Sequence, residues 1–274
     1  MQSSDNNLGL DWTLIFFHIN KAAGQTFRSI LQDQYRDSYI YTIYGENTKG
    51  NHSADFIAFP EEKKRRIKVL MGHMPFGLHV YFSQPSVYIT FLRNPLDRLI
   101  SLYYYILRVE NHPQHDLFIS SGITLETFLT GNNSAQQDNY QVRILTNSLQ
   151  IEPGTITDGI FAQACLNLHK YCPITGIVDR YDESLILFKR AFGWNMPCYK
   201  RKNVSSNRKR NIELSDEVKA IVEENNRYDF ELYNRASKLL DSQIIAQGEG
   251  LAEEVAALRR MNENLHKAAL QGSL

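Results

Sequence analysis

The hydrophobic pattern of the chain alternates between short apolar runs and stretches with helical spacing. Residues 12–19 (WTLIFFHI) are almost continuously apolar and β-prone, residues 20–26 (NKAAGQT) are small or polar, and apolar residues recur at helical spacing over 27–31. This order predicts a strand, a loop and a helix. Residues 66–73 and 86–93 are further β-branched and aromatic runs, which predict two more strands. Strands that are apolar on both faces are typical of the interior of a parallel sheet.

Helices are predicted between and after these strands. Asn94 is a good N-cap residue and Pro95 a good first helical residue, so a helix is expected from there to about Arg108. Periodicity and end signals predict helices at 124–130, 135–147, 158–169, 183–192, 215–226 and 230–240, and a short strand at 173–178. Because strands alternate with helices, we expect an α/β fold with a central parallel β-sheet flanked by helices.

The C-terminal segment has a pattern of its own. After a break at 247–250, steps of four and three residues separate apolar or small positions, with Asn262 in the series: Leu251, Val255, Leu258, Asn262, Leu265 and Ala269. The pattern has two interpretations of equal weight, a coiled-coil homodimer through residues 251–269 or an amphipathic helix packed on its own domain. We therefore predict a main domain over 1–242 and a C-terminal amphipathic helix within 243–274.

Charge and composition narrow the classes of function. Thirty Lys and Arg against thirty Asp and Glu give a net charge of zero, so no overall field attracts nucleic acid or an anionic membrane. The first nineteen residues lack a basic stretch followed by a long apolar one, and the best apolar run, 87–92, is too short to span a bilayer. Cys165, Cys172 and Cys198 lack the spacing of a disulfide framework or a zinc site. We expect a soluble cytoplasmic protein with buried thiols and a local site for any anion.

The loop at 20–26 is a candidate anion site. It leads into the N-terminus of a predicted helix, where backbone N–H groups favour a phosphate-like group, and it carries Lys21 and Gly24. It is not a Walker A loop, because in that motif the lysine follows the second glycine, whereas Lys21 precedes Gly24. On these residues alone, a plain turn with a solvated lysine is an equally good interpretation.

A second anion site is expected after the strand at 86–93. Ligands of open α/β sheets collect at the carboxyl ends of the strands. Arg93 ends this strand and can bind a phosphate through two hydrogen bonds, while Ser101, two turns into the next helix, adds a hydroxyl donor. The pair suits a second phosphate, and an ordinary helical serine is the alternative for Ser101.

Four segments of the chain resemble motifs of the sulfotransferase superfamily. FFHINKAAGQTF (16–27) resembles its 5′-phosphosulfate loop, and YITFLRNPLDRLISLYYYI (88–106) resembles its 3′-phosphate motif. MGHMPFGLH (71–79) is similar to the segment with the catalytic histidine in the carbohydrate branch that includes heparan sulfate 2-O-sulfotransferase. GIVDRYDESLILFKRAFGW (176–194) also resembles that branch. Four motifs in order are far more specific than one.

The resemblance implies a P-loop-like sulfotransferase fold and a particular donor. That donor is 3′-phosphoadenosine 5′-phosphosulfate (PAPS), with PAP as the product and no metal, and the acceptor is a hydroxyl of a carbohydrate or glycoconjugate. By position, Lys21 would contact the phosphosulfate, and the amides of Ala23 to Thr26 with the Thr26 hydroxyl would hold the 5′-phosphate. Arg93 and Ser101 would hold the 3′-phosphate. The full expected donor-binding set is Lys21, Ala22, Ala23, Gly24, Gln25, Thr26, Arg93, Ser101 and Arg201.

Two residues are expected to carry the chemistry. Sulfuryl transfer needs charge stabilisation at the leaving oxygen, expected from Lys21, and a base for the acceptor's proton. His73, at the end of a predicted strand, is the expected general base, because an ordinary histidine pKa of ~6.5 suits that role near neutral pH. His18 and His79 are rivals. Each has a packed or surface histidine as its alternative, which we favour for His18.

The basic segment at 199–210 holds six basic residues and no acidic one, and we expect a surface loop. Arg201 and Arg208 are candidates to contact the nucleotide or an anionic acceptor, and a solvated charge run is an equally good interpretation. Our prediction is a PAPS-dependent O-sulfotransferase. Two other functions stay open, a P-loop-type ATP-dependent kinase and a non-catalytic protein that binds a nucleotide or glycan. The position of Lys21 argues against the first and the presence of His73 against the second.

Overall fold

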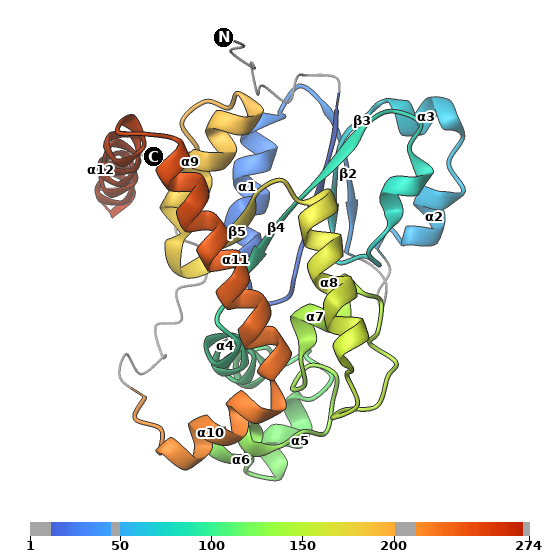
Figure 1. The fold of residues 1–274 in the computed structure, drawn as a ribbon, viewed down its shortest axis with the longest axis vertical. Coiled ribbons are helices and arrows are strands. Elements are labelled where there is room, and N and C mark those ends of the chain that lie inside the picture. The colour runs from blue at the N-terminus through green and yellow to red at the C-terminus, as the bar shows by residue number, and fades with distance from the viewer. Residues whose placement is uncertain (1–11, 45–49, 201–211, 271–274) are drawn as a thin grey trace. The chain divides into compact units, whose positions relative to one another are not determined.

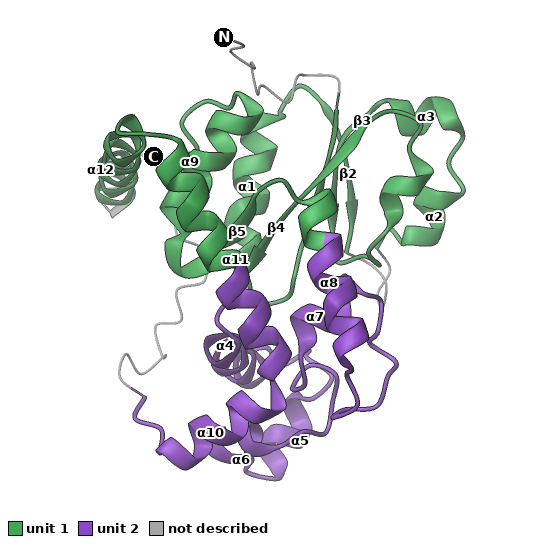
Figure 2. Ribbon diagram, viewed as in Figure 1, with its two compact units in different colours: residues 1–92, 168–202, 236–274 green, residues 93–167, 203–235 purple. Residues whose placement is uncertain are grey.

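The computed structural model describes residues 12–44, 50–200 and 212–270. The chain forms two compact units, which Figure 2 shows in different colours. Unit 1 comprises residues 1–92, 168–202 and 236–274, and unit 2 comprises residues 93–167 and 203–235. Helices α8 (Asp158–Tyr171) and α11 (Arg227–Ala246) contribute residues to both units.

Unit 1 is built on a parallel five-stranded sheet. The strand order is β2-β3-β1-β4-β5, with β1 (Thr13–Phe17), β2 (Tyr39–Ile43), β3 (Ile67–Gly72), β4 (Ser86–Leu92) and β5 (Thr175–Ile177). Ile15 in the central strand β1 lies opposite Leu70 of β3 and Tyr88 of β4. All five residues of β1 are buried. The structure confirms the predicted α/β fold and its central parallel sheet.

Strand β2 was not predicted from the sequence. It lies at the edge of the sheet, where Tyr41 and Ile43 are buried and Tyr39 is exposed. Its sequence, YIYTI, consists of β-branched and aromatic residues, so the strand was overlooked although its residues favour one.

Unit 1 also contains the helices α1 (Gly24–Gln34), α2 (Ser53–Ile57), α3 (Glu61–Arg65), α9 (Tyr181–Phe192) and α12 (Gly250–Leu270), with 3₁₀-helices η1 (Leu78–Tyr81) and η2 (Val178–Arg180). Aromatic side chains connect α1 and α9 to the sheet. Figure 1 shows α2 and α3 beside the β2–β3 edge of the sheet. The buried ring of Phe27 in α1 lies 4.7 Å from the ring centroid of Phe16 and 5.0 Å from that of Phe91. This contact fixes α1 directly after β1.

Helix α12 packs on its own unit. Leu251, Val255 and Leu258, which begin the heptad pattern, are buried. The Glu254 carboxylate pairs with the side chains of two residues of α9, Lys189 and Arg190. The Asn262 side chain accepts a hydrogen bond from the backbone N–H of Tyr199 (2.9 Å). Over 251–262 the pattern therefore describes an amphipathic helix on its own domain.

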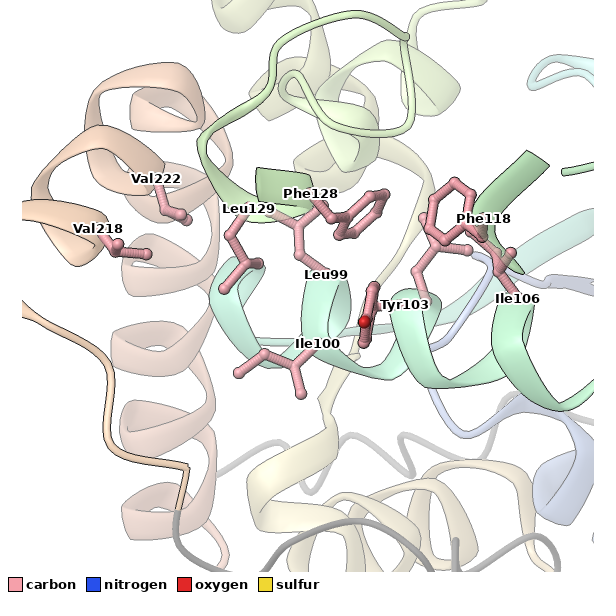
Figure 3. Packing of buried hydrophobic residues seen from close by; sticks show 10 residues of the cluster. Leu99, Ile100, Tyr103, Ile106, Phe118, Phe128, Leu129, Val218 and Val222 are labelled. Atoms are coloured by element: carbon pink, nitrogen blue, oxygen red, sulfur yellow. The ribbon is translucent and has the colours of Figure 1, made fainter. Parts of the chain in front are cut away.

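Unit 2 is helical in the residues that the structure describes. Besides parts of α8 and α11, it contains α4 (Pro95–Arg108), α5 (His115–Ser120), α6 (Leu125–Thr130), α7 (Tyr140–Leu145) and α10 (Asp216–Asn225). The Asn94 side chain accepts a hydrogen bond from the N–H of Asp97 (3.3 Å), which confirms the predicted N-cap of α4. Figure 3 shows the apolar cluster around α4, which contains Leu99, Ile100, Leu102, Tyr103, Ile106, Phe118, Phe128, Leu129, Val218 and Val222.

The prediction of a helix over 135–147 was wrong in length, because α7 begins only after Asn139. Asn139 has a left-handed backbone (φ 46°), and its side chain accepts hydrogen bonds from the N–H groups of Tyr228 and Asp229 (2.9 and 3.1 Å). Asp138 before it forms a buried ion pair with Arg143. Arg143 also donates to the carbonyls of Ser148, Ile151 and Glu152. Polar contacts thus hold the residues before α7, while Val142, Ile144 and Leu145 within α7 are buried apolar side chains.

Three further expectations concern the helices and cysteines. Among the described residues, no helix combines the length and apolar character that a membrane crossing requires. Helix α11 continues through position 243, the expected domain boundary, to Ala246. Cys172 is buried as expected, whereas Cys165 and Cys198 are half-buried; all three are free thiols.

The buried Asp229 predicts a pH dependence of stability. Burial raises the pKa of Asp229 from 3.8 to about 6, against the lowering effects of the N–H groups of Gln141 and Val142 and of the Arg98 charge. Between about pH 4 and pH 6 the folded chain therefore binds more protons than the unfolded chain. We expect the free energy of unfolding to fall as the pH rises through this window, by up to about 3 kcal/mol from this group.

Urea unfolding of the wild type and of Asp229→Asn at pH 4 and pH 6 tests this dependence. The variant lacks the titrating group, so the stability difference between the two proteins should shift in favour of the variant as the pH rises. The same difference at both pH values would contradict the expectation.

Candidate active site

The loop after β1 adopts a constrained backbone. Lys21 and Ala23 have left-handed conformations (φ 69° and 58°), which cost non-glycine residues on the order of 1–3 kcal/mol each. Helix α1 begins directly after Ala23, without a side-chain cap and without an acidic residue in its first turn. The positive end of the helix dipole is thus left uncompensated by protein carboxylates within the turn. This geometry fits an anion such as the 5′-phosphosulfate of PAPS.

The side chains of this loop differ in their exposure to solvent. Ala22, Gly24 and Thr26 are buried, Lys21 is half-buried, and Gln25 is exposed. The side chain of Gln25 is therefore turned toward solvent. The loop presents backbone and one lysine rather than a row of hydroxyl groups.

His73 follows β3 at the next strand end. Gly72 precedes it with φ 147°, and a Cβ atom there would lie 1.8 Å from the Ile43 carbonyl oxygen, so only glycine allows this approach of β2. His73 Nδ1 lies 2.8 Å from the backbone oxygen of His18. Because a carbonyl oxygen can only accept, Nδ1 carries the proton and Nε2 of the neutral ring carries the lone pair. Burial lowers the pKa of His73, against the raising effect of this hydrogen bond. His73 therefore has the protonation state of a general base.

His18 stacks directly on His73. The ring centroids are 4.2 Å apart, and His18 Nδ1 lies 3.2 Å from the hydroxyl of Tyr44. Burial lowers the pKa of His18 well below its ordinary value, and electrostatic interaction with His73 and with the cationic Lys21 and Arg28 lowers it further. The packed role favoured from the sequence fits His18, and its ring also forms part of the proposed catalytic site.

The ring of His18 also occupies the space beside Gly24. A Cβ atom built on Gly24 would lie 1.7 Å from His18 Nε2 and 2.0 Å from Cδ2. Gly24 therefore has a definite reason to be glycine, since any side chain would overlap the imidazole. The His18 ring thus links the start of α1 to His73 after β3.

Two residues of this site were missed by sequence reasoning. Tyr44, just after β2, contacts both histidine rings, with its ring centroid 5.7 Å from that of His18 and 5.2 Å from that of His73. The Arg28 guanidinium lies over the Tyr44 ring, 4.9 Å from its centroid. Burial raises the pKa of Tyr44 to about 12, so its hydroxyl stays protonated at neutral pH. A lone tyrosine and a helical arginine carry no motif that would have identified them.

His79, the second rival base, belongs to another cluster. Its ring centroid lies 4.2 Å from that of Tyr171 with the two planes tilted by 40°, and its Nδ1 lies 3.2 Å from the hydroxyl of Tyr88. Phe76 packs against the same Tyr88 ring. The ring contacts of His79 are thus with Phe76, Tyr88 and Tyr171.

In unit 2, the expected 3′-phosphate residues are Arg93, just before α4, and Ser101, in the middle of α4. Arg93 follows β4 directly in the chain and is half-buried, and Ser101 is half-buried on α4. The side chain of Gln141 forms two hydrogen bonds to the backbone of Arg93. Gln141 was not identified from the sequence. Arg201 and Arg208 lie outside the described residues.

A family model described as galactose-3-O-sulfotransferase matches residues 12–274. The chain belongs to this family. It is therefore a carbohydrate O-sulfotransferase, and the family implies PAPS as the sulfuryl donor. A comparison with curated proteins finds no match.

This membership confirms the prediction of a carbohydrate sulfotransferase. It does not confirm the closer resemblance to heparan sulfate 2-O-sulfotransferase, and nothing supports the kinase or the non-catalytic binding protein. In the sulfotransferase, the uncapped start of α1 and the left-handed residues of the loop before it fit the negatively charged donor that the family implies.

The contact between His18 and Gly24 in the sulfotransferase can be tested by substitution. The imidazole has little freedom to move, because it stacks on Phe16 and His73 and bonds to Tyr44. We expect Gly24→Ala to lower the free energy of unfolding by about 1–3 kcal/mol through overpacking. Adding His18→Ala should recover part of that loss, because the overlap then disappears.

Urea unfolding of the two single variants and the double variant measures this coupling. Gly159→Ala in α8 is the control, since a Cβ there would meet its nearest neighbour, the Thr157 hydroxyl oxygen, at an ordinary 3.8 Å. Additive losses for Gly24→Ala and His18→Ala would contradict the overlap.

Proposed function

We propose that this sulfotransferase transfers a sulfuryl group from PAPS to the 3-hydroxyl of a galactose residue in a glycan, with PAP as the product. The family match carries the choice of acceptor. The loop at 20–26 supports the donor, because its constrained backbone leads into an uncapped helix N-terminus beside a lysine. As in phosphoryl transfer, positioning and electrostatics supply most of the rate enhancement.

The donor-binding roles follow from the loop. PAPS supplies the activated sulfuryl group when bound. We assign the 5′-phosphate to the backbone of Ala23 to Thr26 and to the Thr26 hydroxyl, and Lys21 to the charge that develops on the leaving oxygen. The N–H of Ala22 donates to the Ile19 carbonyl (3.2 Å), so Ala22 is proposed to line the donor site without binding through that group. The lysine belongs to the same turn as the first amides of α1. We expect no metal requirement, so activity should persist with EDTA present.

The 3′-phosphate is assigned to Arg93 and Ser101. The guanidinium can donate two hydrogen bonds to a phosphate, and the serine hydroxyl can donate a third. Arg201 is proposed as a further nucleotide contact on the resemblance alone.

The base of the reaction is His73. Its Nδ1–H is held by the His18 carbonyl, so Nε2 is the atom that accepts the proton of the acceptor hydroxyl. Stacking against His18 and the edge contact with Tyr44 hold the ring in place. Lys21 thus stabilises the negative charge on the leaving oxygen, and His73 accepts the proton of the acceptor hydroxyl.

Two wider expectations rest on the sequence. We propose that any homodimer formed through 251–269 uses the outer end of α12, where Leu265 is half-buried and Ala269 is exposed. Light scattering tests this association.

The cytoplasmic location expected from composition is likewise a proposal, tested by cell fractionation.

A transfer assay with labelled PAPS tests the acceptor. A β-galactoside, its 3-deoxy analogue and desulfated heparan sulfate are compared at equal concentrations. We expect label only in the β-galactoside, because the 3-deoxy compound lacks the attacking hydroxyl. Transfer to heparan sulfate alone, or equal transfer to the 3-deoxy sugar, would overturn the proposed acceptor.

The assignment of His73 as the general base predicts the effect of the His73→Ala substitution on turnover and on its pH dependence. The loss of a general base should reduce turnover by roughly 10²- to 10⁴-fold while PAP binding persists. Because burial lowers the pKa of His73 below 6.5, wild-type kcat/KM should stay high at pH 6.5 and decline only at lower pH. This acidic decline should vanish in the variant.

His79→Ala is the matched control, because it removes another half-buried histidine from a different cluster. It should keep the wild-type pH profile. If His79→Ala abolished the acidic decline and His73→Ala kept it, the assignment of the base would be wrong.

A further inference from the structure

The side chain of Gln141 pairs with the backbone of Arg93. The Arg93 N–H donates to Gln141 Oε1, and Gln141 Nε2 donates to the Arg93 carbonyl, both at 2.9 Å. Gln141 is completely buried. The primary amide thus bonds both the N–H and the carbonyl group of one residue, as a neighbouring strand does in a β-sheet. It fixes the Arg93 backbone at the junction between β4 and α4.

Gln141 is itself held firmly. It is the second residue of α7, and its N–H donates to Asp229 Oδ2 at 2.9 Å, while the next N–H, of Val142, donates to Oδ1 at 2.8 Å. The Asp229 carboxylate thus caps the start of α7 from helix α11. The side chain of Asn139 bonds back to the N–H groups that begin α11. These reciprocal bonds leave the start of α7 little freedom relative to α11.

We propose that Gln141 is a positioning residue for Arg93 in 3′-phosphate recognition, with Asp229 holding Gln141 in place. This inference rests on the proposed function, because the phosphate role of Arg93 belongs to it. The direction in which the long Arg93 side chain leaves the backbone depends on the orientation of its peptide. Bidentate phosphate binding requires that direction to be accurate.

The proposed positioning of Arg93 requires the side-chain amide group of Gln141. It offers one donor and one acceptor on a planar group, which matches the donor and acceptor of the Arg93 backbone. Leucine has a similar size but removes both hydrogen bonds, and asparagine keeps the amide on a side chain that is shorter by one carbon.

The test compares two nucleotides that differ in one phosphate. Dissociation constants of PAP and of 5′-AMP, which lacks the 3′-phosphate, are measured by calorimetry for the wild type, Gln141→Leu and Arg93→Ala. For Gln141→Leu we expect PAP binding to weaken at least tenfold and 5′-AMP binding to change less than twofold. The double variant should bind PAP no more weakly than Arg93→Ala does, because both changes act on the same phosphate contact.

Gln137→Leu is the matched control. Gln137 is also a buried glutamine of unit 2, but its amide bonds the Phe128 carbonyl (2.8 Å) and the Ser134 hydroxyl (3.0 Å) instead of Arg93. This variant should keep the wild-type ratio of PAP to 5′-AMP affinity. Circular dichroism and urea midpoints verify that each variant is folded. If Gln141→Leu does not fold, Gln141→Asn replaces it with the same expected change in ratio.

The outcomes distinguish a failure of the 3′-phosphate role of Arg93 from a failure of the positioning role of Gln141. If Arg93→Ala leaves the PAP to 5′-AMP ratio unchanged, the 3′-phosphate role of Arg93 fails. If Arg93→Ala collapses the ratio while folded Gln141→Leu keeps it, or if Gln141→Leu weakens both nucleotides equally, the positioning role of Gln141 is overturned.

Discussion

The parallel pairing of β1 with β3 determines where the polar residues of unit 1 gather. In this register Phe17 lies opposite Gly72, so the residues that follow, His18 and His73, emerge at the same edge of the sheet. A shift of one residue would turn these side chains to the opposite face. Burial of β1 on both faces resists such a shift, because it would carry apolar side chains out of their contacts. The hydrophobic strands thus set the geometry of a polar site that they do not themselves contain.

The local parts of the fold and site could be predicted from the sequence. Continuous apolar runs indicated β1, β3 and β4, and Asn94 with Pro95 marked the start of α4, because these signals lie within a few residues of the element they specify. The motifs around Lys21 and His73 predicted their roles, which stay predictions. Edge strand β2 was overlooked although its residues are β-prone. The left-handed turn at Asn139 could not be predicted, since it is stabilised by hydrogen bonds to a distant helix.

The same limit explains the missed side chains. Tyr44 is 26 residues from His18, and Gln141 is 48 residues from Arg93, yet each pair is joined by hydrogen bonds. Nothing near these residues in the sequence distinguishes them from an ordinary tyrosine or glutamine. Their roles depend on tertiary contacts, which periodicity and capping rules do not encode.

His18 joins the anion loop and the base into one mechanical element. Its ring rests against Gly24 at the start of α1, and its carbonyl oxygen holds Nδ1 of His73. A displacement of this one residue would therefore reach both partners together, the loop through the side chain and the base through the main chain. In the proposed mechanism, the alignment of donor and acceptor is thereby tied to a single residue, so that a donor misplaced in the loop would also face a misoriented His73.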